Sequence, residues 1–207
     1  HIEFLLDSGS GRTMLDLARI VAASTSGPLV LGASNPVRAF DLAVPALEGR
    51  VVHSNRGQAG IDGSIATAVG ICLGSGYADE ASAPSDERVT AVMGDLTACH
   101  DASSLALVAS TGAHLDIVVA DDHGGGIFAT LEHGRATSPE AYDRWFGLAQ
   151  SVDYEALAAA YGVAFARAGE PRELEDLLDR PVRGPRLIHA PVERAEDLYR
   201  AIRDVLS

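Results

Sequence analysis

Two short apolar runs of the sequence each end in acidic residues. The run Val89–Met93 is followed by Gly94 and Asp95, and the run Leu115–Ala120 is followed by an acidic pair that contains Asp122 and then by three glycines. We expect both runs to be buried parallel strands. Asp122 follows Asp95 by 27 positions, about the length of a loop, a helix and a strand. One crossover of that length predicts that the two strand ends lie side by side or close to it.

Two carboxylates at one sheet edge repel each other unless a cation lies between them. Carboxylate oxygens and a nearby glycine carbonyl are ligands that suit Mg²⁺ or Ca²⁺. The glycines at 124–126 let the backbone approach a phosphate closely. The pattern therefore predicts a divalent cation that bridges a diphosphate to the protein at the C-terminal edge of the sheet. The alternative is a structural one, in which Gly94-Asp95 is a turn with a helix cap and the glycines form a plain surface loop.

Two arginines follow other apolar runs. Arg56 lies in the glycine-containing segment Ser54–Gly63, and Arg38 lies two residues after Pro36, where we expect a helix to start. An arginine in the first turn of a helix is unfavourable for the helix dipole, so another role is indicated. Both arginines are candidates for binding carboxylates of a ligand. The alternative for each is a solvated surface side chain.

The elements that position these residues alternate between strands and helices, which predicts βαβ units and a three-layer, doubly wound, mostly parallel six-stranded α/β sheet. A connector over Gly76–Glu87 and a long loop over His123–Phe146 complete the expected fold, and Trp145 and Phe146 are expected to anchor that loop to the core or to a partner subunit. The predicted strands are Leu29–Gly32, Val51–His53, Val89–Met93, Leu115–Ala120, Val163–Ala166 and Leu187–Ala190. The predicted helices are Thr13–Ala23, Ile61–Leu73, Ala102–Ser110, Asp153–Tyr161, Pro171–Leu178 and Ala195–Leu206.

Composition narrows the classes of function. The 207 residues include 29 acidic and 16 basic ones, a formal net charge of −13, which argues against nucleic-acid binding. No run of about 18 apolar residues occurs, so we expect no membrane insertion. Two cysteines are too few for a disulfide framework and favour a reducing compartment, hence a cytoplasmic protein. The chain begins with His1 rather than Met, from which we expect a processed chain or a fragment.

Four segments together resemble the C-terminal, diphosphate-binding domain of the MenD family of thiamine-diphosphate-dependent synthases in menaquinone biosynthesis. They are Ser34-Asn-Pro-Val-Arg38, Ser54-Asn-Arg-Gly-Gln-Ala-Gly-Ile-Asp-Gly63, Gly94-Asp-Leu-Thr-Ala-Cys-His-Asp101 and Gly124-Gly-Gly-Ile-Phe128. The resemblance implies a diphosphate-binding domain over residues 27–207, preceded by a linker or leading helix over 1–26. The pyrimidine-binding and central domains of the family have no counterpart in these 207 residues.

The resemblance also implies roles for particular residues. Thiamine diphosphate would bind with Mg²⁺, for which Mn²⁺ or Ca²⁺ could substitute, and no catalytic residue is expected here because the activating Glu belongs to the pyrimidine-binding domain. The implied metal ligands are the side chains of Asp95 and Asp122 and the carbonyl of Gly124. The implied cofactor-binding residues are Ile61, Gly94, Asp95, Leu96, Thr97, Gly124, Gly125, Gly126 and Ile127. The implied substrate-binding residues are Ser34, Arg38, Arg56, Ile127, Phe128 and Leu131.

The implied activity is that of a transferase that decarboxylates 2-oxoglutarate and adds the remaining carbanion to isochorismate. The site would form with the pyrimidine-binding domain of a second subunit in a homodimer or other homo-oligomer, so we expect the isolated fragment to be inactive. Two alternatives remain, namely the same domain of another thiamine-diphosphate carboligase or decarboxylase, and a non-catalytic binding module. A nicotinamide-binding domain is disfavoured because no Gly-x-Gly-x-x-Gly follows the first strand.

Three further residues are expected to have structural roles only. We expect Asp101 to cap a helix rather than to take part in catalysis. His189 shows no metal-ligand spacing, and no functional role is expected of it. Arg194 precedes a terminal helix rich in acidic residues and is expected on a solvated face.

Overall fold

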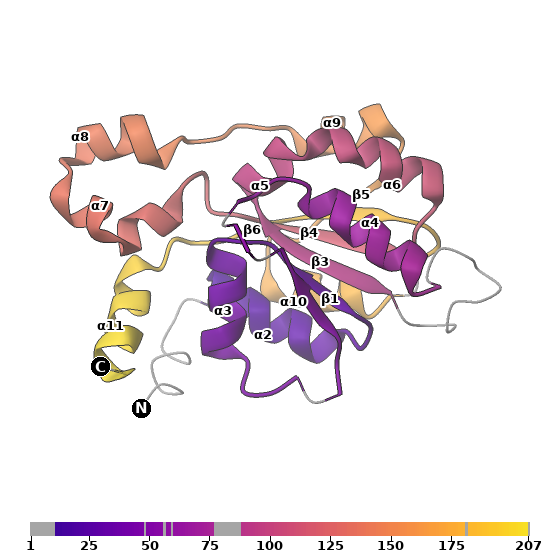
Figure 1. The fold of residues 1–207 in the computed structure, drawn as a ribbon, viewed down its shortest axis with the longest axis horizontal. Helices are drawn as coiled ribbons and strands as arrows, with labels where there is room; N and C mark the ends of the chain where they lie inside the picture. Colours follow the sequence, from indigo (N-terminus) through magenta and orange to yellow (C-terminus); the bar gives the residue numbers. More distant parts are fainter. Residues whose placement is uncertain are drawn as a thin grey trace.

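The computed structural model describes residues 11–47, 49–55, 57–58, 60–76, 88–180 and 182–206. These residues form one six-stranded, all-parallel sheet with helices on both faces (Figure 1). All six predicted strands are confirmed, each within one residue at either end. The strands are β1 (Leu29–Leu31), β2 (Val52–Ser54), β3 (Val89–Gly94), β4 (Leu115–Asp121), β5 (Ala164–Arg167) and β6 (Arg186–Pro191).

The strand order is β2-β1-β3-β4-β6-β5, so the chain reverses its direction of travel across the sheet between β1 and β3. In open parallel sheets, ligands bind in the crevice outside the carboxyl ends of the strands at such a reversal. The topology alone therefore directs attention to the residues that follow β1 and β3, which are Ser34 and Asp95.

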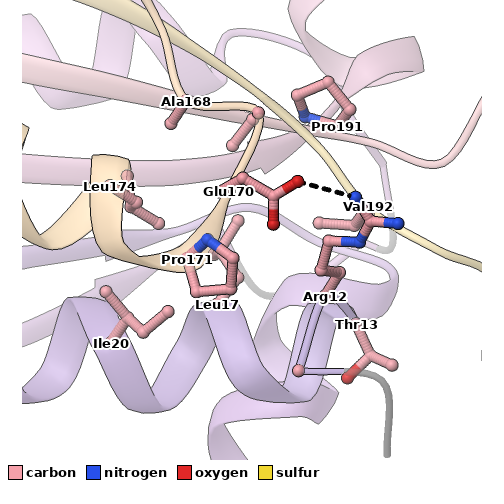
Figure 2. A pocket seen from close by; sticks show the side chains of 13 residues that line it. Arg12, Thr13, Leu17, Ile20, Ala168, Glu170, Pro171, Leu174, Pro191 and Val192 are labelled. Atoms are coloured by element: carbon pink, nitrogen blue, oxygen red, sulfur yellow. Dashed lines mark hydrogen bonds and ion pairs between the residues drawn. The ribbon is translucent and has the colours of Figure 1, made fainter.

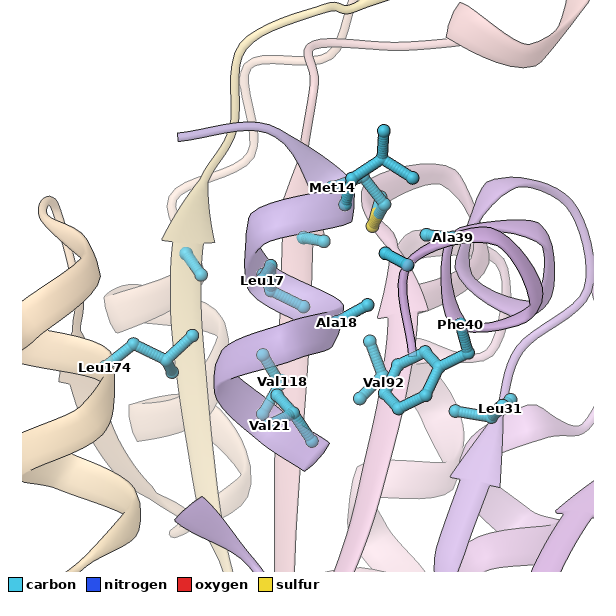
Figure 3. Packing of buried hydrophobic residues seen from close by; sticks show 14 of the residues in the cluster. Met14, Leu17, Ala18, Val21, Leu31, Ala39, Phe40, Val92, Val118 and Leu174 are labelled. Carbon is cyan, nitrogen blue, oxygen red and sulfur yellow. The ribbon is translucent and has the colours of Figure 1, made fainter. Parts of the chain in front are cut away.

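Alternation along the strands divides the core between the two faces. In β3, Val92 points to one face and Met93 to the other, and in β4 Val118 and Val119 divide in the same way. Figure 3 shows Val92 beside Phe40 and Val118 beside Val21, in the core under the helices of the first face. The first face is covered by α2 (Met14–Ser24), α3 (Asn35–Ala43), α10 (Pro171–Leu178) and α11 (Glu196–Leu206). The second face is covered by α4 (Ser64–Gly74), α5 (Asp95–His100), α6 (Leu105–Thr111, preceded by the 3₁₀ turn η1, Ala102–Ser104) and α9 (Tyr154–Tyr161).

Helix α2 is the leading helix that the sequence predicts over residues 13–23. Thr13 caps it, because the Thr13 hydroxyl accepts from Asp16 N (3.3 Å) while Asp16 Oδ2 accepts from Thr13 N (2.9 Å). Its Leu17 and Val21 are buried in the first core cluster. The helix thus packs on the sheet, and the domain boundary at residue 26 stays a prediction.

The segment predicted as a long loop over 123–146 is largely helical, so that prediction is wrong. It contains η2 (Gly126–Thr130), α7 (Glu132–Ala136), α8 (Pro139–Tyr142) and η3 (Asp143–Gly147), with α7 and α8 projecting away from the sheet (Figure 1). Ser138 caps α8 by accepting from Ala141 N, a signal that Ser-Pro-Glu already carries. Residues 77–87 of the predicted connector lie outside the described part of the chain.

Aromatic side chains fold the end of this segment back onto its start. Phe146 contacts Phe128, with ring centroids 5.6 Å apart, and the Tyr142 hydroxyl donates to the Gly125 carbonyl (3.0 Å). Phe146 therefore holds the two ends of the segment together, and its anchoring to the core or to a partner subunit stays a prediction. Trp145 does not anchor it to the core, because 64% of Trp145 is exposed and Arg144 lies over its ring.

A shallow pocket that is open to solvent, with about 290 Å³ of empty space, lies where α2, α10 and the end of β6 meet. Figure 2 shows apolar side chains such as Leu17 and Leu174 around it, with Arg12 paired to Glu170 at 2.9 Å. Arg12 also pairs with Glu193 (3.1 Å). These contacts tie the residues before α2 to the loops that follow β5 and β6. No helix in the described part of the chain is long and apolar enough to cross a lipid bilayer.

Candidate functional site

The main cavity lies at the carboxyl ends of β1, β3 and β4, where the topology places a ligand crevice. It holds about 540 Å³ of empty space. The lining residues are Met14, Ser34, Asn35, Pro36, Ile61, Gly94, Asp95, Leu96, Thr97, Ala120, Asp122, Gly124, Gly125, Gly126, Ile127 and Phe128.

Asp95 and Asp122 meet in this cavity. Strands β3 and β4 pair in parallel with Gly94 opposite Ala120, so the residues that follow these two share one edge. Asp95 is 2% exposed; its Oδ1 accepts from Leu96 N (2.8 Å), and its buried Oδ2 has no hydrogen-bond partner among the described residues. The adjacency predicted from the spacing of the two aspartates is therefore present.

The electrostatics of the pair are unfavourable without a cation. Burial raises the pKa of Asp95 to about 7, partly offset by the Leu96 N–H and reinforced by the charge of Asp122. Burial likewise raises the pKa of Asp122 to about 6, although the charge of Arg194 opposes the rise. A buried and a half-buried carboxylate with raised pKa values are expected where a positive group is needed to hold both in the charged form.

The donor set fits Mg²⁺. No group of three His, Cys, Asp or Glu side chains within the described ranges is arranged to hold a metal ion. A cation here would take two carboxylates and complete its coordination with backbone, ligand or water oxygens, which is how Mg²⁺ is usually bound beside phosphates. Oδ2 of Asp95, which has no hydrogen-bond partner among the described residues, would be available as one such ligand.

Each of the three consecutive glycines lies in close approach to another group, which is backbone at Gly124 and Gly125 and a side chain at Gly126. A β-carbon on Gly124 would collide with the Gly147 carbonyl, and one on Gly125 with the carbonyl of Phe146. A β-carbon on Gly126 would collide with Oδ2 of Asp122. Gly125 N also donates to the Gly147 carbonyl at 2.6 Å. The glycines therefore let the backbone pass between the helical segment and the Asp122 carboxylate.

Gly94 lacks a side chain for a different reason. Its φ of −76° is available to any residue, and nothing lies within 4 Å of where its β-carbon would stand. Since Gly94 lines the cavity, a β-carbon there would occupy space that this fold leaves open for something else.

Asp101 positions the helix that follows the Ile61 loop. Helix α4 begins after Gly63, which has no capping side chain, and Asp101 Oδ2 accepts from Ile65 N (2.6 Å) and Ala66 N (3.2 Å) instead. The prediction that Asp101 caps a helix is confirmed, although it caps α4 rather than its own helix. The cap fixes the loop that carries Ile61 into the cavity.

Arg194 holds the loop after β4 by hydrogen bonds to two of its backbone carbonyls. Its Nε donates to the Asp122 carbonyl (2.9 Å) and its Nη2 donates to the carbonyl of His123 (3.0 Å). Arg194 is exposed, as expected of a residue on a solvated face, but its two hydrogen bonds to this loop were not expected. The residues in contact are 71 and 72 positions apart in the sequence, and no local pattern signals the contact.

A protein-family model described as the thiamine pyrophosphate enzyme C-terminal TPP-binding domain matches residues 37–190. The chain belongs to this family. The match covers the residues from α3 to β6, and with them the part of the cavity formed by the ends of β3 and β4.

Curated relatives of this TPP-binding domain are named 2-succinyl-5-enolpyruvyl-6-hydroxy-3-cyclohexene-1-carboxylate synthase, and the resemblance to the MenD family is thereby confirmed. The relative from Nocardioides sp. is 40% identical over 98% of this chain and 38% of its own length. That from Paenarthrobacter aurescens is 42% identical over 87% of this chain and 32% of its own. The relative from Mycobacterium tuberculosis is 43% identical over 86% of this chain and 33% of its own length. The chain spans about a third to two fifths of these relatives.

Solved structures share the fold of this TPP-binding domain. Benzoylformate decarboxylase from Polynucleobacter necessarius superposes with a TM-score of 0.71 at 18% identity, over 87% of this chain and 33% of that one. The thiamine diphosphate-dependent 4-hydroxybenzoylformate decarboxylase of Rhodococcus jostii superposes with a TM-score of 0.69 at 19% identity, over 91% of this chain and 34% of that one. The predicted three-layer, doubly wound fold is confirmed.

Most residues expected in the TPP-binding domain's site gather at the cavity. All the residues expected to bind the cofactor or the metal line it, as do Ser34, Ile127 and Phe128 of the substrate set. Arg38 and Leu131 do not line it, and Arg56 lies outside the described residues. Met14, Asn35, Pro36 and Ala120 also line it, although no role was expected of them. The roles of all these residues stay predictions.

Arg38 is exposed and donates from Nη1 to the carbonyl of Ser34 (2.7 Å). Ser34 has a φ of 79°, a strained conformation for a residue with a side chain, at the tip of β1. Strained backbone often accompanies ligand sites, and here it lies on the cavity wall.

Proposed function

We propose that this chain is the C-terminal cofactor-binding domain of a thiamine-diphosphate-dependent 2-succinyl-5-enolpyruvyl-6-hydroxy-3-cyclohexene-1-carboxylate synthase of menaquinone biosynthesis. One observation carries the proposal. Asp95 and Asp122, at the ends of neighbouring parallel strands, line one cavity, and the buried Oδ2 of Asp95 has no hydrogen-bond partner in the described part of the chain. The names of the curated relatives support the choice of reaction.

Asp95, Asp122 and the Gly124 carbonyl would hold Mg²⁺, or Mn²⁺ or Ca²⁺ in its place. The cation would neutralise the carboxylates and the diphosphate together. The backbone of residues 94–97 and 124–126 would surround the diphosphate, because these residues have small or absent side chains at the cavity wall or stand at the start of α5. Ile61 and Ile127 would supply apolar contact to the rings of the cofactor.

When bound, thiamine diphosphate supplies the carbon nucleophile and the electron sink for decarboxylating a 2-oxo acid. This chain's own residues would bind the two anionic substrates, 2-oxoglutarate and isochorismate. Ser34, Arg38 and Arg56 would contact their carboxylates, and Phe128 and Leu131 would cover the apolar side and exclude water. The placement of Ser34 and Phe128 on the cavity wall supports this division.

The activating Glu would come from the pyrimidine-binding domain of a second subunit, in a homodimer. The share of the relatives that this chain spans, about two fifths or less, supports a site completed by other domains. A cytoplasmic location is supported by the two cysteines, Cys72 and Cys99, which are both free.

Calorimetric titration with thiamine diphosphate, with and without Mg²⁺, tests the cofactor. We expect binding that requires Mg²⁺ and that falls by about tenfold or more in Asp95→Asn and Asp122→Asn. Asp41→Asn, an exposed aspartate on α3, is the control for the loss of one negative charge. Equal affinities in the wild type, Asp95→Asn and Asp122→Asn would refute the site.

The substrate is tested separately, in the protein joined with its pyrimidine-binding domain. We expect release of CO₂ from 2-oxoglutarate, and a KM for 2-oxoglutarate raised by about tenfold in Arg38→Lys because a bidentate contact is lost. Turnover of other 2-oxo acids but not of 2-oxoglutarate would assign the chain to another carboligase or decarboxylase. Cofactor binding without any turnover would indicate a binding module.

A further inference from the structure

A buried polar pair lies behind the wall of the candidate site. Nε2 of His189 in β6 is 2.8 Å from Oδ2 of Asp121 at the end of β4. His189 is 9% exposed and Asp121 is 6% exposed, and neither lines the main cavity. The pair therefore does not itself contact a ligand there, and its role has to act through other residues.

The surroundings of His189 fix which ring nitrogen donates. Nη1 of Arg167 lies 3.5 Å from Nδ1 of the ring, so Nδ1 faces a donor and serves as the acceptor. Nε2 then carries the proton and donates it to Asp121. The ring of Tyr154 packs against the imidazole with centroids 4.8 Å apart, and the Tyr154 hydroxyl reaches the carbonyl of Asp95 (3.5 Å). The orientation of His189 is thus determined by contacts on three sides.

Asp121 connects His189 to the loop that follows β4, because its carboxylate bonds both. Its second oxygen, Oδ1, accepts from the backbone N of His123 at 2.9 Å. His123 has a φ of 60°, in the left-handed region that disfavours a residue with a β-carbon, and Gly124 follows at 124°. The Asp121 carboxylate therefore stabilises an otherwise unfavourable turn. The same turn sets where the Asp122 side chain and the Gly124 carbonyl point.

A second buried pair at the other end of the same two strands provides a comparison. Nε of Arg186 in β6 donates to Oδ1 of Asp116 in β4 at 2.9 Å, and both side chains are buried. Arg186 also donates to the carbonyl of Leu177 in α10, and Asp116 also accepts from Arg88, at the amino ends of the strands and far along β4 from Asp122. It shares the chemistry of the His189–Asp121 pair but not its connection to the cavity.

We propose that His189 is a positioning residue, which through Asp121 holds the turn at His123 and so sets the affinity of Asp122 and Gly124 for a divalent cation. The choice of a divalent cation as ligand rests on the proposed function. The positioning itself rests on the hydrogen bonds from His189 to Asp121 and from His123 to Asp121. Residues that orient metal ligands in this way typically change metal affinity by about 10–100-fold when replaced.

The experiment compares three variants of this chain by two measurements. His189→Leu keeps bulk but removes the donor, His189→Gln restores an amide donor at a similar reach, and Arg186→Leu breaks the comparison pair. Mn²⁺ binding is followed by electron paramagnetic resonance, with Mn²⁺ alone as the probe. Hydrogen–deuterium exchange of the peptide over residues 121–128 reports whether the turn is held.

We expect His189→Leu to bind Mn²⁺ about tenfold more weakly and to lose amide protection over 121–128, while His189→Gln recovers most of both. Arg186→Leu should lower stability without changing either measurement. Unchanged protection and affinity in His189→Leu, or an equal loss in Arg186→Leu, would overturn the positioning role. A wild type that binds no Mn²⁺ would contradict the proposed function instead, and loss of protection confined to His189→Leu would still support the positioning of the turn.

Discussion

Gly126 lies directly against the carboxylate of Asp122, so closely that a β-carbon at position 126 would overlap Oδ2. Gly126→Ala must therefore displace the Asp122 side chain. We expect the fold to persist and Mg²⁺ affinity to fall by about tenfold or more, measured by calorimetry. Gly70→Ala is the matched control, because Gly70 is exposed in α4 with open space around it, and it should stabilise the protein by about 0.5–1 kcal/mol. Unaltered Mg²⁺ affinity in Gly126→Ala would show that Asp122 is not a ligand.

Gly94→Ala tests whether the open space beside Gly94 is reserved for a ligand. Because its φ is ordinary and no atom lies within 4 Å of the new methyl group, the free energy of unfolding should change by less than about 0.5 kcal/mol. The methyl group would occupy the cavity, so affinity for thiamine diphosphate with Mg²⁺ should drop by about tenfold or more. Urea unfolding and calorimetry measure the two quantities. A variant that is less stable but binds normally would contradict this assignment.

The stability of the metal-free chain should depend on pH through Asp95. Burial raises the pKa of Asp95 to about 7, above its ordinary value of 3.8, so the folded state binds more protons between these values. When a chelator keeps the chain free of metal, the contribution of Asp95 to stability is present at low pH and is lost as the pH rises from about 4 to about 7. Urea unfolding across that range should show a steeper fall for the wild type than for Asp95→Asn. Parallel curves would contradict the raised pKa.

Asp116→Asn tests the opposite end of the sheet. Asp116 is 2% exposed and lies between two buried guanidinium groups, with Arg88 Nε at 2.8 Å and Arg186 Nε at 2.9 Å. Removing its charge leaves both arginines buried without a counter-charge, at a cost of about 3–5 kcal/mol in the free energy of unfolding. Cofactor affinity, measured well below the melting temperature, should not change. A loss below about 1 kcal/mol would mean that water reaches the arginines.

Residue pattern alone was enough to predict the sheet and the meeting of Asp95 with Asp122. Buried parallel strands are continuous apolar runs, and a single crossover leaves little choice about where two strand ends lie. The helical turns over 126–147 were missed because three glycines dominate the local pattern, while the order of the segment comes from Phe128, Tyr142 and Phe146 meeting in space.

The contacts of His189 and Arg194 could not be predicted because they depend on register. His189 reaches Asp121 across 68 positions, and only the pairing of β4 with β6 brings them together. Arg38 likewise turns to the carbonyl of Ser34, a direction that no spacing rule specifies. The sequence indicates which types of residue collect at the edge of the sheet, and the fold determines which of them contact one another.

The buried Oδ2 of Asp95, which lacks a hydrogen-bond partner among the described residues, bears on how fast the protein is degraded in a cell. Any ligand that binds only the folded chain stabilises it by mass action, and a cation at Asp95 also removes a burial penalty. If Asp95 binds a cation as proposed, molecules without the cation should open more often than molecules with it, and opened chains are the ones that proteases cut. Quality control would then remove empty copies first, so that magnesium supply would govern how much of the protein accumulates as well as how much is active.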